Sequence, residues 1–267
     1  VSKVIGDSRV SAVTMTGSTK AGRSVAKTAG QNLKKTVLEL GGSDPYIILD
    51  DADLDKTVNS CINGRILNSG QSCISAKRII ATENTYDLVL EKLENNLFSK
   101  IMGDPFDNVD IGPMVSLKAR DEVHNQVTRS IDAGAILVMG GFIPDMPGAF
   151  YPITLLANVE VGMAAFEEEI FGPVFSLTKA NDNHHAIELA NQTPFGLGAA
   201  VFTRNTEEGV NIAKTRIYAG SCFVNDFVKS DPRLPFGGIK ESGYGRELSS
   251  FGMMEFVNVK TIVTSDA

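Results

Sequence analysis

Two short glycine-rich segments carry the residues best suited to chemistry. One is Leu-Glu-Leu-Gly-Gly at residues 38–42, and the other is Gly-Gln-Ser-Cys at residues 70–73. Together they supply one carboxylate, Glu39, and one thiol, Cys73. A thiol attacks carbon as its thiolate, so it needs a base or a lowered pKa, and a carboxylate can act as that base. The pair therefore suggests a cysteine nucleophile with a general base.

The setting of Cys73 differs from that of the other two cysteines. Cys73 falls on a connection between a predicted helix at residues 53–67 and a predicted strand at residues 76–81, and catalytic groups favour such connections. The alternative is an inert core thiol, because free cysteine is among the most buried residue types. Cys61, on the apolar stripe of the helix, and Cys222, at the start of an apolar strand, fit that alternative better.

Glu39 lies between two leucines in a predicted buried strand at residues 36–40. Burial raises the pKa of a carboxyl group, and a raised pKa suits a general base that works near neutral pH. The alternative is a structural salt bridge, because a buried carboxylate without a partner is costly.

Residues 16–19, Thr-Gly-Ser-Thr, indicate a phosphate site, because they follow a predicted strand and open a helix predicted at residues 23–35. Backbone N–H groups at the start of a helix attract phosphate. Residues 17–24 also nearly match the P-loop of NTPases, with Asp50 at the end of a strand as a magnesium ligand. Arg23 replaces the lysine of that motif, so the NTPase interpretation is the weaker one.

Predicted strands alternate with predicted helices along the chain, which favours an α/β fold with a largely parallel sheet. The helix at residues 86–101 is strongly amphipathic. Beyond the ranges already given, the predicted strands are residues 10–16, 45–49, 135–139, 153–156, 174–178, 198–202 and 221–224, and the predicted helices are residues 118–133, 184–192 and 207–215.

Composition and charge argue against several classes of function. The chain has 267 residues, 43% hydrophobic and 21% charged, which is ordinary for a globular protein. The net charge is −7 and no Lys/Arg-rich run is present, so we expect no nucleic-acid partner. No apolar stretch approaches the roughly 20 residues of a membrane span. The three cysteines form no disulfide framework, which favours the cytoplasm, and the histidines form no zinc-like set, so we expect no metal.

Six ordered motifs, covering essentially the whole chain, resemble the C-terminal part of the aldehyde dehydrogenase superfamily. They are residues 16–19, 38–42 and 70–73, Glu-Glu-Ile-Phe-Gly-Pro at 168–173, Pro-Phe-Gly-Gly at 235–238, and Ser-Gly-Tyr-Gly-Arg-Glu at 242–247. The resemblance implies an aldehyde dehydrogenase-like catalytic domain, with a parallel-rich sheet flanked by helices, plus a remnant of a Rossmann-type cofactor domain. We expect the remnant at residues 1–41, the catalytic domain at residues 42–235, and a C-terminal return with an oligomerisation strand at residues 236–267.

The family oxidises aldehydes to carboxylates with NAD or NADP, and the resemblance implies a role for each motif. Cys73 is the implied nucleophile, which forms a thiohemiacetal and then a thioester, and Glu39 is implied to activate the hydrolytic water. The implied cofactor contacts are Thr16, Gly17, Ser18, Leu40, Gly41, Glu169 and Phe171, and the implied substrate contacts are Phe236 and Ser230.

The segments at residues 230–236 and 38–45 are most similar to succinate-semialdehyde dehydrogenases, so the expected substrate is succinate semialdehyde or a similar small aldehyde. Some of those enzymes bind the substrate carboxylate with an arginine six residues before the nucleophile, where this chain has Leu67. The cationic group is therefore expected elsewhere, or the aldehyde differs. A non-catalytic protein that keeps the fold is the alternative from another functional class.

The chain begins at Val1 and enters a helix-like pattern at once, which we interpret as part of a longer protein. By the resemblance, the remaining part holds an oxyanion-hole Asn and a ribose-binding Lys, so this chain alone is expected to be poorly active. The strands at residues 10–16 and 36–40 are expected to leave a sheet edge open. Residues 255–264 alternate as an exposed strand would, and in the family this strand joins subunits, so we expect a homo-oligomer.

Overall fold

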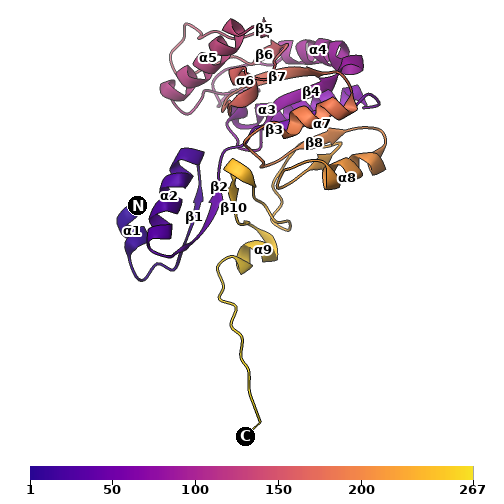
Figure 1. The fold of residues 1–267 in the computed structure, drawn as a ribbon. Helices are drawn as coiled ribbons and strands as arrows, with labels where there is room; N and C mark the ends of the chain where they lie inside the picture. Colours follow the sequence, from indigo (N-terminus) through magenta and orange to yellow (C-terminus); the bar gives the residue numbers. More distant parts are fainter. Residues whose placement is uncertain (267) are drawn as a thin grey trace.

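The computed structural model describes residues 1–266 and has the α/β architecture expected from the sequence. Its strands form two sheets, one of three strands and one of seven. Figure 1 shows the two sheets as distinct parts of the molecule, with the C-terminal residues extending away from both. The chain passes between the sheets at residues 40–43. The predicted boundary at residue 41 lies in this connection, and the division into domains stays a prediction.

The small sheet consists of β1 (Ala12–Thr16), β2 (Lys35–Glu39) and β10 (Gly243–Tyr244). β1 and β2 run parallel, with Thr16 opposite Glu39, and β10 runs antiparallel to β2. The helix α2 (Thr19–Gln31) packs beside these strands, and α1 (Ser2–Gly6) packs against α2. A short 3₁₀ helix, η2 (Lys240–Ser242), leads into β10.

The bounds of α2 correct the helix predicted at residues 23–35. The Ser18 side chain accepts a hydrogen bond of 3.3 Å from the Ala21 N–H and caps the helix, which therefore begins at Thr19. The helix ends at Gln31, and Leu33 soon after it has a φ of 52°, in the left-handed region that a right-handed helix does not use.

β1 stays at an edge of the small sheet, as expected from the sequence, but the edge of β2 is not open. β10 pairs with it, and Tyr244 lies opposite Leu38. The hydroxyls of Tyr244 and Thr36 are 2.6 Å apart, and the Leu40 N–H donates to the Ser242 carbonyl at 3.0 Å. The motif at residues 242–247, which the sequence pattern would class as a turn, therefore completes the small sheet and leaves β1 at the other edge.

Parallel pairing dominates the large sheet, and β5 and β6 are its one antiparallel pair among the residues described. The strands are β3 (Asp44–Ile48), β4 (Ala76–Thr82), β5 (Ile136–Met139), β6 (Thr154–Ala157), β7 (Val174–Ala180), β8 (Ala200–Phe202) and β9 (Phe223–Val224). Their order is β5-β6-β7-β4-β3-β8-β9, so β4 is the central strand.

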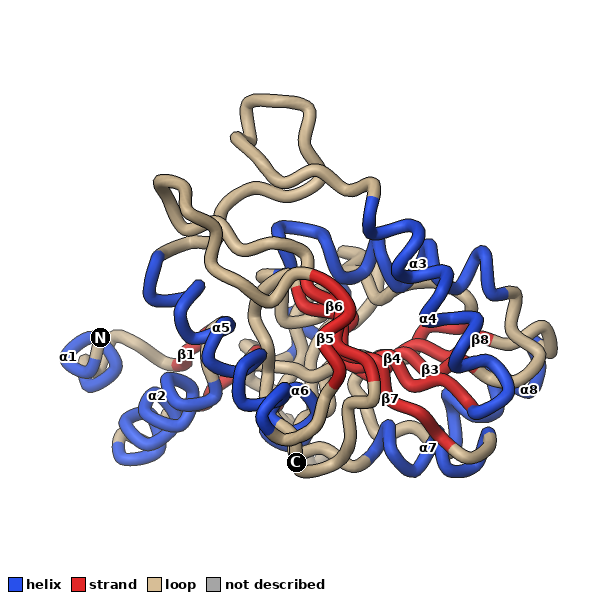
Figure 2. Tube along the Cα trace, turned by 90° about the horizontal axis from the view of Figure 1, so that it is seen from above, coloured by secondary structure: helices blue, strands red, loops and turns tan. Residues whose placement is uncertain are grey.

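Helices cover both faces of the large sheet. Figure 2 shows α3 and α4 on one side of the strands and α7 on the other. The bounds are α3 (Leu54–Ile66), α4 (Glu83–Phe98), α5 (Leu117–Asp132), α6 (Ala164–Glu167), α7 (Asn183–Asn191) and α8 (Thr206–Thr215). No helix within residues 1–266 is long and apolar enough to cross a membrane.

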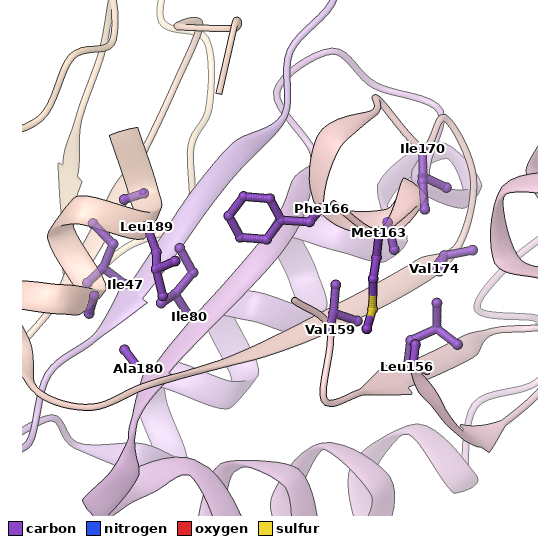
Figure 3. Packing of buried hydrophobic residues seen from close by; sticks show 14 of the residues in the cluster. Ile47, Ile80, Leu156, Val159, Met163, Phe166, Ile170, Val174, Ala180 and Leu189 are labelled. Atoms are coloured by element: carbon purple, nitrogen blue, oxygen red, sulfur yellow. The ribbon is translucent and has the colours of Figure 1, made fainter. Parts of the chain in front are cut away.

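Side chains of the central strands alternate between two hydrophobic cores. Ile47 and Ile80 enter the core that contains Phe166, which Figure 3 shows, whereas Ile48 and Ile79 enter the core on the other face. Burial of an aliphatic side chain of this size contributes about 1.5–3 kcal/mol to folding. Packing on both faces therefore fixes β3 and β4, and this matters because the candidate site is attached to the ends where these strands begin.

The C-terminal residues do not form the strand predicted at residues 255–264. The helix α9 (Ser249–Met254) precedes residues 257–266, which are exposed and have neither helical nor strand structure. A strand needs a partner that satisfies its backbone N–H and C=O groups, and no other strand of the described chain pairs with this segment. Val259 and Ile262 are each 80% exposed as a result.

Candidate active site

The candidate site lies where the two sheets meet. β1 and β2 end beside it, and β3, β4 and β7 begin beside it. It contains a cavity of about 550 Å³, a size typical of small-molecule sites. The cavity is lined by Thr16, Gly17, Ser18, Leu40, Gly41, Gln71, Ser72, Cys73, Glu169 and Phe171. The structure therefore brings Cys73 together with every cofactor contact that the sequence predicted.

Cys73 follows a tight turn in which only a glycine fits at position 70. The 3₁₀ segment η1 (Leu67–Gly70) has positive φ values of 52° at Asn68, 55° at Ser69 and 73° at Gly70. A Cβ atom at Gly70 would overlap the carbonyl group of Gly172. The glycine of the Gly-Gln-Ser-Cys motif thus lets the turn pack directly against the loop that follows Phe171.

Two side chains of the turn fix it to the neighbouring loop. The Ser69 hydroxyl donates to the Gly112 carbonyl at 3.0 Å, and the Gln71 side-chain carbonyl accepts from the Val115 N–H at 2.8 Å. These bonds tie both sides of the turn to residues 112–115, so the backbone that carries Cys73 is held before any ligand binds.

A fully buried guanidinium joins the two loops of the site. Arg65, from α3, donates to the Val174 carbonyl at 2.6 Å, the Ser75 hydroxyl at 2.8 Å and the Ile170 carbonyl at 3.0 Å. Burial lowers the pKa of Arg65 to about 9. Arg65 thereby fixes the residues just after Cys73 to the segment that surrounds Phe171.

The surroundings of Cys73 favour the neutral thiol overall. Its side chain is partly buried, and burial raises the pKa of the thiol above its ordinary value. Asp44 and Glu169 raise that pKa further, whereas the positive charge of Lys77 lowers it. The partial exposure of Cys73 suits a nucleophile, but its thiolate is not favoured, so a base or a nearby cation must assist ionisation.

Glu39 ends β2 with a carboxylate that is only 2% exposed. Burial, with a smaller contribution from Glu247, raises its pKa to about 8, and Arg246 partly opposes this change. Within the described chain neither carboxylate oxygen has a hydrogen-bond partner. The predicted raised pKa of Glu39 therefore agrees with the structure, and the alternative of a structural salt bridge does not.

The Glu39 carboxylate faces the C-terminal return and does not line the cavity. A Cβ atom at Gly237 would lie 2.6 Å from Glu39 Oε1, so the glycine makes room for the carboxylate. Phe236, next to this glycine, is half-buried, and Ser230 is exposed. Neither residue lines the cavity that contains Cys73, and their assignment as substrate contacts stays a prediction.

Glu169 is held on the opposite wall by groups from two parts of the chain, the Gly-Gly pair after β2 and Lys77 of β4. Its Oε1 accepts a hydrogen bond of 3.0 Å from the Gly42 N–H and lies 3.5 Å from Lys77 Nζ. A Cβ atom at Gly41 would overlap its other oxygen. Gly41 is thus required for Glu169 to approach the backbone this closely.

The chemistry of the walls fits a nicotinamide dinucleotide. Gly17 and the cap residue Ser18 stand at the start of α2, where unpaired N–H groups and the helix dipole favour the phosphates of a ligand. Leu40 and Phe171 supply apolar surface for a planar ring, and the Glu169 carboxylate can accept hydrogen bonds from ribose hydroxyls.

The NTPase alternative gains no support from the topology. Residues 17–24 follow a strand of the small sheet, whereas Asp50 follows β3 of the large sheet. Arg23 forms an ion pair of 2.7 Å with Glu241, which commits its guanidinium elsewhere. A P-loop and its magnesium ligand must share one metal ion, and this arrangement does not bring them to neighbouring strands.

Two charged residues of the site, Arg65 and Lys77, were not predicted from the sequence. Lys77 and Arg78 stand in β4, in which every residue is buried. Since a buried charge needs partners, two basic residues within an apolar strand are a signal that could have been used. Their side chains leave opposite faces of the sheet, and only that of Lys77 reaches the cavity residues.

Comparison with known proteins agrees with this fold. Residues 1–262 match the model of the aldehyde dehydrogenase family. The chain therefore belongs to the aldehyde dehydrogenase family, which confirms the resemblance seen in the six motifs.

The curated relatives include an NADP(+) succinate-semialdehyde dehydrogenase of Mycobacterium leprae and the NAD(P)+ succinate semialdehyde dehydrogenase Sad of Escherichia coli K12. Each is 47% identical over 98% of this chain. The solved structures include a succinic semialdehyde dehydrogenase of Streptococcus pyogenes in complex with NADP+, at 43% identity and a TM-score of 0.96, covering 99% of this chain and 58% of that one. This chain spans 57% of the length of the two curated relatives.

Proposed function

We propose that this chain carries the catalytic centre of an NAD(P)-dependent aldehyde dehydrogenase that oxidises succinate semialdehyde or a similar small aldehyde. One observation carries the proposal: a single cavity is lined by Cys73, by the loop at residues 16–18 that opens α2, and by Glu169 and Phe171. Family membership supports the class of reaction, and the names of the 47% identical relatives support the substrate.

Cys73 is the nucleophile in this proposal. Its Sγ forms a bond to the aldehyde carbon, and the thiol proton is transferred to the former carbonyl oxygen, which gives a thiohemiacetal. A nicotinamide cofactor bound in the cavity would accept the hydride that this carbon then loses, and the hydroxyl proton would pass to water. The product on Cys73 is a thioester. The turn before Cys73, which Gly70 and Gln71 fix, holds the backbone that carries Sγ during both steps.

Glu39 is the base of the second half of the reaction. It takes a proton from water as the water oxygen bonds to the thioester carbon, and the carbon–sulfur bond to Cys73 then breaks to release the acid. Its raised pKa, about 8, makes it a stronger base than an exposed carboxylate. Because its two oxygens have no hydrogen-bond partner in the described chain, the side chain can turn from Gly237 towards Cys73 without losing a bond.

The direct test is cofactor reduction by the full-length polypeptide that contains this chain. We expect reduced nicotinamide to form from succinate semialdehyde with NADP+ or NAD+, and Cys73→Ser to lower the rate by at least ~10³-fold. Cys222→Ser is the matched control, because Cys222 packs against the core and lines no part of the cavity, and it should keep the rate. No oxidation of any small aldehyde by the wild type would favour the non-catalytic alternative.

A homo-oligomer belongs to the same proposal. Residues 257–266 carry exposed apolar side chains on backbone that pairs with no strand of the described chain, which suits pairing with a second copy. The intracellular location expected from the cysteine content stays a prediction.

A further inference from the structure

Lys77 lies buried beneath the cavity, 2% exposed, in contact with the turn that carries Cys73. Its Nζ donates hydrogen bonds of 2.8 Å to the carbonyl oxygens of both Ser72 and Cys73. The same nitrogen lies 3.5 Å from Oε1 of Glu169. Three acceptors around one nitrogen match the three hydrogens of an ammonium group, whereas a neutral amine has only two. Burial and the charge of Arg65 lower the pKa of Lys77, whereas Glu169 and Asp44 oppose this change, and the three acceptors favour the charged form.

The ammonium also reaches the other wall of the cavity. It lies 6.0 Å from the centroid of the Phe171 ring, within the range of a cation–π contact. Glu169, its ion-pair partner, in turn accepts the Gly42 N–H. One side chain of the central strand thus joins the Cys73 turn to both predicted cofactor residues of the opposite wall.

The charges around the Cys73 thiol come from three elements of the large sheet. Asp44 begins β3, Glu169 precedes β7, and Lys77 lies in β4. Both carboxylates oppose ionisation of the thiol, and Lys77 favours it. Lys77 also acts on Asp44: burial raises the pKa of this carboxyl to about 6, and Lys77 opposes the rise. Without Lys77 the thiol would face the buried carboxyl group of Asp44 and the partly exposed one of Glu169, with no opposing positive charge.

We propose that Lys77 is a positioning residue for Cys73: its ammonium holds the nucleophile turn by two consecutive carbonyls and supplies the positive charge that favours the thiolate. The inference rests on the proposed role of Cys73 as the nucleophile. Lys77 itself is covered by the turn and by the residues of the cavity wall, so it acts on the reaction through the turn that it holds and through its charge, without touching the substrate.

The test is the rate at which iodoacetamide alkylates Cys73 as a function of pH, with the labelled peptide identified by mass, in the full-length polypeptide without cofactor or aldehyde. We expect iodoacetamide to alkylate Cys73 about tenfold more slowly at pH 7 in Lys77→Met than in the wild type. The profile of alkylation rate against pH should be displaced to higher pH. Lys77→Gln, which keeps N–H donors but has no charge, should show the same displacement. A folded Lys77→Met protein whose profile coincides with the wild type would overturn the proposal.

Lys179→Met is the matched control. Lys179 also has one carboxylate partner, Glu83 at 3.3 Å, and one aromatic ring, Tyr86 at 5.7 Å, and none of these residues lines the cavity. Its alkylation profile should match the wild type, and a displacement equal to that of Lys77→Met would overturn the proposal. Failure of both Lys77 variants to fold, judged by circular dichroism and thermal melting, would also overturn it, because the lysine would then serve the core.

The alkylation assay needs no enzymatic turnover, so it separates the two proposals. Lysine-dependent alkylation of Cys73 in a protein that oxidises no aldehyde would refute the proposed function and leave the positioning role intact. Normal aldehyde oxidation by the wild type, together with a Cys73 alkylation profile that is the same with and without Lys77, would refute the positioning role alone.

Discussion

The backbone N–H of Gly42 donates a hydrogen bond of 3.0 Å to the Glu169 carboxylate and so joins the connection between the two sheets to the loop that precedes β7. The neighbouring Gly41 permits this contact, because a Cβ atom there would overlap the second carboxylate oxygen. A carboxylate predicted to bind the cofactor is therefore placed by a glycine that follows the base-bearing strand.

Gly41→Ala should weaken cofactor binding by displacing Glu169. We expect the KM for the nicotinamide cofactor to rise about tenfold or more, since misplacement of a positioning group by about 1 Å is costly. Gly30→Ala in α2 is the control, because nothing lies within 4 Å of a Cβ atom at that position. That substitution should leave the KM unchanged and should be neutral or stabilising by up to about 1 kcal/mol. Equal KM values in the two variants would contradict the role of Gly41.

The three thiols should differ in reactivity. Cys61 is fully buried, and burial raises its pKa far above the ordinary value; burial also raises the pKa of Cys222 to about 12. Cys73 is partly exposed and has Lys77 beside it. Iodoacetamide near neutral pH should therefore label Cys73 about 10 to 100 times faster than the other two, as measured by peptide mass. Equal labelling of all three would remove Cys73 as the nucleophile.

Glu39→Gln should change how stability depends on pH. Burial raises the pKa of Glu39 from 4.5 to about 8, so between these pH values the folded chain keeps a proton that the unfolded chain has lost. The contribution of Glu39 to stability is complete below pH 4.5 and falls as the pH rises towards 8. Between pH 4.5 and pH 7, the wild type should therefore lose about 3 kcal/mol of unfolding free energy that Glu39→Gln does not lose.

Urea unfolding of both proteins across this pH interval checks the prediction. Glu91→Gln, at an exposed position of α4, is the control and should follow the wild-type profile. If the Glu39→Gln profile also ran parallel to the wild type, Glu39 would have no raised pKa in the folded chain.

The exposed C-terminal residues should control self-association. Val259 and Ile262 are each 80% exposed. The double variant Val259→Lys, Ile262→Lys would place charge on the surface that we expect a second copy to cover. Light scattering after size exclusion should show a smaller particle for this double variant. Phe106→Lys is the control, because Phe106 is 98% exposed in a different part of the chain. The same particle size in all three proteins would exclude these residues from the interface.

Much of the large sheet could be predicted because its strands are short apolar runs bounded by turn residues. Burial on both faces makes the interiors of β3 and β4 largely apolar, with Asp44, Lys77 and Arg78 as the charged exceptions. The pairing of β10 with β2 could not be predicted, since Gly243–Tyr244 is too short to have a strand pattern and its partner lies far away in the sequence. The alternating tail was predicted as a strand because a pattern of side chains does not reveal whether a pairing partner exists.

The cavity residues could be predicted because they belong to ordered motifs, whereas their supports could not. Arg65 and Lys77 act through hydrogen bonds to backbone carbonyls that only the folded chain brings together. The direction of the Glu39 carboxylate was also hidden, because a strand pattern shows that a residue is buried but not which rotamer it takes. Here the room beside Gly237 of the C-terminal return accommodates it.

The central claim is that Cys73 forms the covalent bond to the substrate and Glu39 activates the water that breaks it. In the full-length Glu39→Gln protein, thioester hydrolysis should be slow, so an initial burst of reduced nicotinamide should be followed by a much lower steady rate. The most direct measurement is an acid quench after mixing with succinate semialdehyde and cofactor, followed by peptide mass mapping. We predict a succinyl group on the peptide that contains Cys73. A succinyl group on the Cys61 or Cys222 peptide, or product formation with no acylated cysteine, would contradict this account.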